Sequence, residues 1–142
     1  MTTTHPFARK KRSPGPLQGT PLSDTVPADE LRRLDQVGTM VTLKETRSVI
    51  QQSGLGRQCL VVIDGTMRVE RDGAHVADLG AGDLAGEVGI LTGRPCNATV
   101  VAESGTSVYA MNRRELATLL AACPALNAQV WRTALDRIPA AR

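Results

Sequence analysis

The stretch that decides the fold is MRVERDGAHVAD, Met67 to Asp78. Two short runs suited to β-strands flank the dipeptide Asp72-Gly73. A two-residue loop of this composition is typical of a type I′ turn, because both central residues of that turn need positive φ. The sequence therefore predicts a β-hairpin in which Val69 faces Val76 across the ladder.

The same succession of short strand-like runs and turns extends on both sides of the hairpin, from Met40 to about Met111. Short runs rich in Val and Ile, of about four to six residues, alternate with turn signals about every eight to ten residues, which is typical of an antiparallel sandwich or barrel. The turn dipeptides are Ser53-Gly54, Asp64-Gly65, Asp72-Gly73 and Ala81-Gly82.

Helical periodicity frames this β region on both sides. Before it, PADELRRLDQV begins at Pro27 and repeats an apolar residue every three positions, which predicts a short helix. After it, Asn112 and Glu115 have the spacing of a capping box, which predicts a helix start. Pro124 then separates two predicted C-terminal helices, and Pro139 ends the second. The apolar positions expected on their buried faces are Leu116, Leu119, Leu120, Leu126, Val130, Leu135 and Ile138.

The first 26 residues differ from the rest. They contain four prolines and the basic cluster Arg9 to Arg12, and they have too few apolar residues to offset the entropy of ordering. We expect residues 1–26 to be a disordered, basic, Pro-rich tail and residues 27–142 to be one domain. The cluster carries four of the 17 Lys and Arg residues, which leaves 13 basic against 14 acidic residues from Ser13 onward. The tail could contact nucleic acid or an anionic surface, or act only as a solubilising arm.

Composition excludes several classes of function. The three cysteines are Cys59, Cys96 and Cys123; they are far apart, odd in number and lack the spacing of a metal site or a disulfide framework. With only His5 and His75 in addition, we expect no metal, no catalytic residues and no enzyme activity. No apolar run approaches the ~18 residues of a membrane span, and no secretory signal begins the chain, so a cytoplasmic protein is expected.

A phosphate-binding pattern occurs in GEVGILTGRPCNATV, residues 86–100, which we call the cassette. With the run QQSGLGRQCLVVIDGTMRVERDGAHVADLGAGDLAGEVGILTG before it and the predicted helices after it, the segment from about Leu31 to Ile138 resembles a cyclic nucleotide-binding domain. The resemblance implies an eight-stranded, jelly-roll-like β-roll. It also implies a short N-terminal helix, a short helix inside the cassette and two C-terminal helices.

The resemblance also implies a ligand site. In the family, backbone at the Gly86-Glu87 position approaches a cyclic phosphate, and the Glu accepts hydrogen bonds from a ribose hydroxyl. The residues that this carries over, if the pocket is active, are Gly86, Glu87, Val88, Cys96, Asn97, Ala98 and Thr99. An apolar side chain of the last helix covers the base in the family; here Trp131 could do so, or could be a core residue.

The phosphate half of the cassette departs from the family. The family's phosphate-binding Arg is replaced by Cys96, and Asn97 stands where Ser, Thr or Ala is usual. Arg94 has a long side chain and is a candidate substitute, two positions away. Ala85 and Arg47 also differ from the family pattern. Cys96 itself could be a small buried residue or a redox-sensing thiol.

These observations favour a stand-alone regulatory module with weakened or lost nucleotide binding, acting through contacts with an unidentified protein partner. The alternative is a functional cyclic AMP or cyclic GMP receptor that uses Glu87 with Arg94 and Asn97. No cofactor is expected; the candidate ligand is cyclic AMP or cyclic GMP, and the terminal helices could pair in a homodimer. A transcription regulator is less consistent with the sequence, because no DNA-reading helix pair follows Ile138. A cupin-like enzyme would need His and carboxylate ligands that the sequence lacks.

Overall fold

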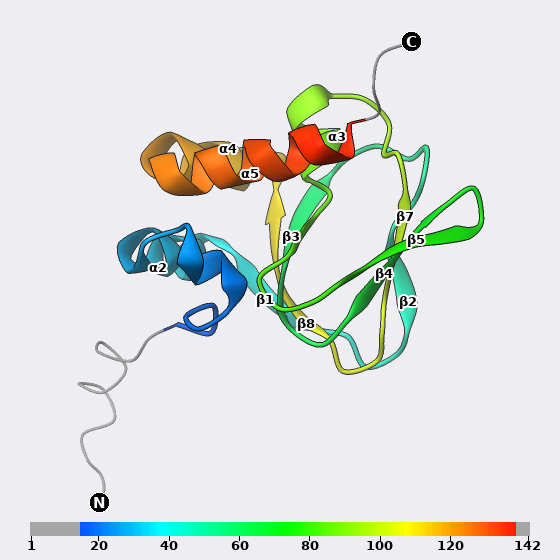
Figure 1. The fold of residues 1–142 in the computed structure, drawn as a ribbon, viewed down its shortest axis with the longest axis horizontal. Helices are drawn as coiled ribbons and strands as arrows, with labels where there is room; N and C mark the ends of the chain where they lie inside the picture. The colour runs from blue at the N-terminus through cyan, green and yellow to red at the C-terminus, as the bar shows by residue number, and fades with distance from the viewer. Residues whose placement is uncertain (1–14, 139–142) are drawn as a thin grey trace, which may run out of the picture.

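The computed structural model describes residues 15–138, and in that range eight strands form two four-stranded antiparallel sheets with helices on one side (Figure 1). The strand orders are β1-β8-β3-β6 and β2-β7-β4-β5. The predicted mainly-β architecture with flanking helices is confirmed. The strands are β1 (Thr39–Thr42), β2 (Arg47–Ile50), β3 (Gln58–Asp64), β4 (Met67–Arg71), β5 (Ala74–Leu79), β6 (Leu84–Ala85), β7 (Thr99–Ala102) and β8 (Ser107–Asn112).

The hairpin that opened the sequence argument is β4–β5. Asp72 has φ 54° and Gly73 has φ 81°, so both turn residues have the positive φ that a type I′ turn requires. The predicted pairing of Val69 with Val76 is wrong, because the register shifts by one residue between Val69 and Glu70. Val69 pairs with Ala77, and Val76 is the extra residue of a β-bulge.

Alternation along β3 divides the apolar core into two clusters. Cys59 and Val61 point towards the helices, whereas Leu60 and Val62 point between the two sheets. Strand β8 divides in the same way, with Tyr109 and Met111 on the helical side. The central residues of β3 and β8 are therefore buried on both faces, and these two strands form the wall between the β-roll and the helices.

The N-terminal boundary differs from the prediction. Within residues 15–26, a 3-10 helix (η1, Pro21–Asp24) forms, and Leu17, Leu22 and Val26 are buried in the helical-side core. The expectation of disorder is therefore wrong for residues 15–26, because three spaced apolar side chains give even a Pro-rich segment enough surface to bury. The basic cluster lies outside the described residues.

Three helices pack against the wall: α2 (Ala28–Val37), α4 (Arg113–Ala122) and α5 (Pro124–Arg137). Figure 1 shows α4 and α5 together, with α2 beneath them. The buried carboxylate of Glu30 in α2 accepts hydrogen bonds from the backbone N–H groups of Ala125 (3.2 Å) and Leu126 (2.8 Å). A carboxylate at a helix N-terminus satisfies donors that have no partner inside the helix, so α2 fixes where α5 begins.

The helix predictions are largely confirmed. Asn112 and Glu115 form the complete capping box at the start of α4. In α5 the buried stripe is Leu126, Val130 and Ala134, and Leu135 is 64% exposed. The expectation that Leu135 belongs to the buried face is wrong, because the stripe continues at the i+4 position, Ala134. Among the described residues, no helix combines the length and apolar character needed to cross a membrane.

Candidate ligand pocket

The cassette begins at a glycine that no other residue could replace without strain. Gly86 has φ 86°, in the left-handed region, and a Cβ placed on it would lie 2.2 Å from the backbone oxygen of Gln58 in β3. Only a residue without a Cβ can pass this close to β3 at that φ. Gly86 therefore sets Glu87 in the first turn of the cassette helix α3 (Glu87–Thr92), against the wall of the roll.

Helix α3 is held by a side chain from α4. Arg113 donates from Nη1 to the carbonyl oxygen of Ile90 (3.0 Å) and from Nη2 to that of Gly56 (3.2 Å). Gly56 also lies directly against α3, because a Cβ on Gly56 would be 2.7 Å from the carbonyl carbon of Gly89. These contacts fix the cassette helix relative to the β2–β3 loop and α4.

Glu87 is fully buried, and it is paired with a residue that the sequence argument missed. Nη1 of Arg137, the last residue of α5, donates to Oε1 (2.9 Å) and Oε2 (2.8 Å) of Glu87 and to the carbonyl oxygen of Leu84 (2.6 Å). The side chain of Arg137 is 32% exposed. The sequence does contain a signal for Arg137, because it follows Val130 and Ala134 at the next i+3 step of their buried stripe. A charged residue at such a position needs a partner of opposite charge.

Glu87 and Arg137 face a cavity of about 130 Å³ lined mainly by the cassette, β4, β5 and α5. Six of the predicted site residues line it: Gly86, Glu87, Val88, Cys96, Asn97 and Ala98. Residues outside the prediction also line it: Ile50, Val69, Arg71, Val76, Ala77, Leu79, Ala85, Gly89, Val100 and Arg137.

Comparison with known proteins identifies the family of the chain. The family model described as "Cyclic nucleotide-binding domain" matches residues 40–123, more than half of the chain. The chain belongs to the cyclic nucleotide-binding domain family. The match spans the β-roll, the cassette and α4, so the predicted resemblance is confirmed.

Three individual similarities accompany this match, and the two solved structures among them show the same fold. A cyclic nucleotide-gated potassium channel of Rhizobium etli is 27% identical over 89 residues, which are 63% of this chain and 25% of the channel. The chain thus spans about a quarter of the length of that curated relative. A PKAR CBD2 structure with bound Sp-2Cl-cAMPS has a TM-score of 0.71 at 20% identity and 93% coverage of both chains. The regulatory subunit of a cAMP-independent protein kinase A from Trypanosoma brucei has a TM-score of 0.70 at 23% identity, covering 84% of this chain and 44% of that one.

Three predicted site residues of this cyclic nucleotide-binding domain do not line the cavity. Arg94 is exposed on the loop after α3. Trp131 lies on α5 with 40% of its surface exposed and is not among the cavity's residues. Thr99 instead accepts a hydrogen bond at Oγ1 from the backbone N–H of Gln52 (2.9 Å), which ties β7 to the end of β2.

Cys96 does line the cavity, as a buried and uncharged residue. Its backbone pairs with the β2–β3 loop: its N–H donates to Gly54 (2.8 Å), and its carbonyl accepts from Ser53 (2.7 Å). Burial raises the pKa of the Cys96 thiol, so the thiol stays protonated near neutral pH. The position therefore supplies no positive charge to an anion.

Asn97 connects the cassette to two arginines. Its side-chain Nδ2 donates to the backbone carbonyl of Arg137 (3.0 Å), and its own carbonyl accepts from Nε of Arg71 (2.9 Å). Arg71 was also missed by the sequence argument. Among the described residues, no group of three or more His, Cys, Asp or Glu side chains could hold a metal ion.

Proposed function

We propose that this domain is a regulatory module whose cyclic nucleotide pocket is occupied by its own Arg137, so that cyclic AMP and cyclic GMP bind weakly or not at all. The observation that carries the proposal is the pairing of Arg137 with both oxygens of the fully buried Glu87. A ribose hydroxyl that donates to Glu87 must compete with a guanidinium that already contacts both carboxylate oxygens, and that contact adds an ion-pair attraction that a neutral hydroxyl lacks.

The missing charge at Cys96 supports the same proposal. A hydrogen bond to a charged group contributes about 1.5–3 kcal/mol. An anion bound without that contact loses about ten- to 150-fold in affinity. The predicted substitute, Arg94, does not line the cavity, so it offers no replacement from its present position.

The small volume of the cavity also supports weak or absent nucleotide binding. Pockets for drug-sized ligands have volumes of about 300–1,000 Å³, compared with the cavity of about 130 Å³ here. Because Arg137 forms part of the lining, its departure would enlarge the space beside Glu87. The Trypanosoma brucei neighbour is the regulatory subunit of a cAMP-independent protein kinase A, so independence from cyclic AMP has a parallel on this fold.

Calorimetric titration with cyclic AMP and with cyclic GMP tests this proposal on the full chain. Arg137→Gln removes the competing charge and is expected to bind more tightly than the unmodified protein. Arg114→Gln is the matched control, because Arg114 is exposed on α4 and does not line the cavity. Tight binding by the unmodified protein, unchanged in Arg137→Gln, would show that Arg137 does not close the pocket.

The domain then acts through protein contacts, and we propose a second copy of the chain as the partner at α5. Trp131 and Leu135 lie four residues apart and are both exposed, which places two large apolar side chains on one outward strip. Arg132 and Asp136 flank this strip and are also exposed. When two copies of α5 pack antiparallel, Arg132 of each copy can pair with Asp136 of the other copy. Reciprocal contacts of this kind are what a two-fold interface requires. Light scattering should give a dimer that Leu135→Glu converts to a monomer; a monomer before mutation would contradict this part.

A further inference from the structure

The second arginine of the pocket, Arg71, occupies an unusual position in β4. Met67 is buried between the two sheets, and Val69 packs against the same cluster. Side chains two residues apart point to the same face of a strand, so Arg71 is the third inward-facing residue of β4. The inner face of the strand thus ends in a guanidinium where the alternation predicts an apolar side chain.

The other arginine of this strand behaves differently. Arg68 points outward and pairs with the carboxylates of Glu103 and Glu70. Arg71 makes no ion pair with a carboxylate of the described residues, and its one hydrogen bond among them is from Nε to the carbonyl oxygen of Asn97. Within residues 15–138 its two Nη groups have no acceptor, so they can donate to a ligand.

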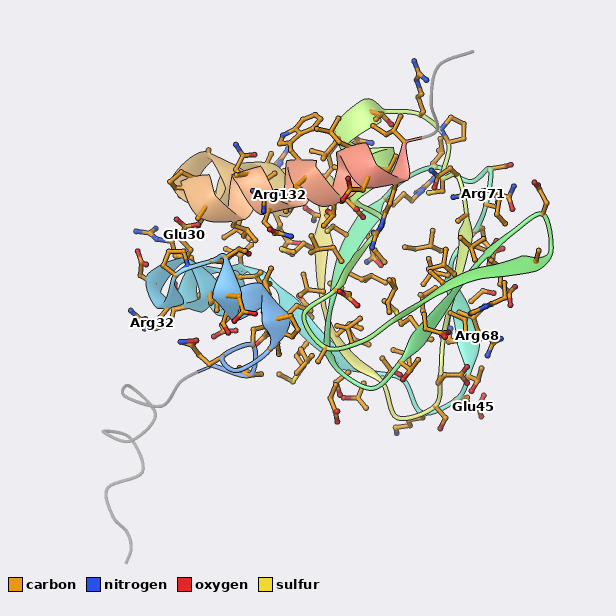
Figure 2. All side chains as sticks on the ribbon, in the orientation of Figure 1. Glu30, Arg32, Glu45, Arg68, Arg71 and Arg132 are labelled. Atoms are coloured by element: carbon orange, nitrogen blue, oxygen red, sulfur yellow. The ribbon has the colours of Figure 1, made fainter. Side chains whose placement is uncertain are left out.

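The β4–β5 turn is anchored beside the pocket. The backbone N–H of Asp72 donates to Oε1 of Gln52 (2.8 Å), and Nε2 of Gln52 donates back to Oδ1 of Asp72 (2.9 Å). Gln52 is in turn bonded to Thr99, at the end of the cassette. Figure 2 shows Arg71 near the hairpin turn, on the side of the roll opposite α2. These contacts hold Arg71 in place next to the second half of the cassette.

The charges that line the cavity do not balance. Glu87 is neutralised by Arg137, and Arg71 is left as an additional positive charge. Arg71 and Cys96 line the same cavity, and Arg71 contacts the residue that follows Cys96. A half-buried guanidinium with unused donors in a small, mostly apolar cavity matches a phosphate or phosphodiester monoanion, because such donors pair best with two acceptor oxygens.

We propose that Arg71 is the anion-binding residue of this pocket, and that it contacts the phosphate of a phosphodiester ligand in place of the arginine missing at Cys96. The proposal rests on the proposed function in its weak-binding form, in which a cyclic nucleotide still binds at this pocket. It attributes the remaining affinity for the nucleotide to Arg71 in β4 and not to Arg94.

The test is an NMR titration of the full chain with cyclic AMP and, separately, with the uncharged nucleoside adenosine. Arg71→Gln should weaken cyclic AMP binding by about ten-fold or more, because one charge-assisted contact is lost, and should change adenosine binding less than about two-fold. Arg71→Lys keeps the charge and should recover part of the loss. Arg94→Gln is the control, since its exposed side chain lies on the same cassette, and its affinity should match the unmodified protein.

Three results would overturn the inference. They are unchanged cyclic AMP affinity in Arg71→Gln, an equal loss for adenosine, and no cyclic AMP binding by the unmodified chain. Unchanged cyclic AMP affinity would mean that Arg71 does not contact the ligand. An equal loss for adenosine would mean that Arg71 only supports the structure of the pocket. Tight cyclic AMP binding that Arg71→Gln abolishes would refute the weakened pocket while supporting Arg71, so the two proposals fail separately.

Discussion

Nη1 of Arg137 lies 2.9 Å and 2.8 Å from the two carboxylate oxygens of Glu87, and this pair joins the end of α5 to the start of the cassette helix. Glu87 is fully buried, whereas Arg137 keeps about a third of its side chain in contact with solvent. The pair is therefore asymmetric: Glu87 depends on Arg137 for its charge compensation, and Arg137 can leave towards solvent.

The first prediction concerns the stability of this pair. Arg137→Gln leaves the buried carboxylate without a counter-charge and should lower the free energy of unfolding by about 1–3 kcal/mol, below the ~3–5 kcal/mol of a fully buried pair because Arg137 is partly exposed. Glu87→Gln added to Arg137→Gln should restore much of that loss. Urea denaturation of the two single variants and the double variant measures the coupling; additive effects would show that the pair contributes nothing.

The second prediction concerns the cassette glycine. Gly86→Ala places a Cβ 2.2 Å from the carbonyl oxygen of Gln58, in addition to the cost of positive φ. Gly93→Ala is the matched control, because Gly93 has φ 70° and open space around its Cβ position. We expect about 1 kcal/mol of destabilisation for Gly93→Ala and at least ~2 kcal/mol more for Gly86→Ala. Equal losses in thermal or urea unfolding would mean that the approach to β3 is not close.

The third prediction concerns the N-terminal boundary. Leu17 is fully buried although it precedes the domain boundary expected from the sequence. Leu17→Ala should destabilise the protein by about 2–4 kcal/mol, as for other buried leucines. Leu55→Ala should change stability by less than about 0.5 kcal/mol, because Leu55 is 71% exposed. If chemical denaturation gave the same small change for both, residues 15–26 would not belong to the core.

The fourth prediction concerns Cys96 and pH. Burial raises the pKa of the Cys96 thiol above the ordinary value of about 8.5. Because the thiolate is the nucleophile, alkylation by iodoacetamide near pH 7.5 should be slower than for a free cysteine, and its rate should still be rising above pH 8.5. Peptide mass spectrometry resolves Cys96 from the other two cysteines. A rate that levels off below pH 7 would instead indicate a redox-sensing thiolate.

The same shift fixes the sign of the stability change with pH. The folded protein holds the thiol proton more tightly than the unfolded chain does, so the contribution of Cys96 to stability is constant below the unfolded pKa of about 8.5. It falls as the pH rises from that value through the raised folded pKa, because only the unfolded chain then releases the proton. Burial also raises the thiol pKa of Cys59 and Cys123, so their effects add in the same direction.

Local sequence signals predicted much of the fold. The Asp72-Gly73 turn and the Asn112–Glu115 capping box depend on neighbouring residues only, and both formed as expected. The bulge at Val76 was not predictable, because alternation is maintained on either side of the extra residue and nothing local marks it. Burial of Leu17 and Leu22 depends on helices more distant in the sequence.

The residues of the candidate site likewise divide into those that the sequence could predict and those that it could not. Gly86, Glu87, Cys96 and Asn97 lie within one short segment, so the family resemblance could place them together. Arg71 and Arg137 are 66 positions apart in the sequence and meet the cassette only because the β-roll folds and α5 returns to it. Arg94 was the nearest cation in sequence, yet its side chain is exposed, because proximity along a loop does not fix direction.

The most direct test of the central claim is the affinity of the Cys96→Arg, Arg137→Gln double variant for cyclic AMP, measured by calorimetry beside the unmodified protein. The first change supplies the missing cation and the second frees Glu87. We predict weak or undetectable binding by the unmodified protein and a gain of at least ~100-fold in a folded double variant, from two charge-assisted contacts of about 1.5–3 kcal/mol each. Equal affinities for the two proteins, whether tight or absent, would contradict the account.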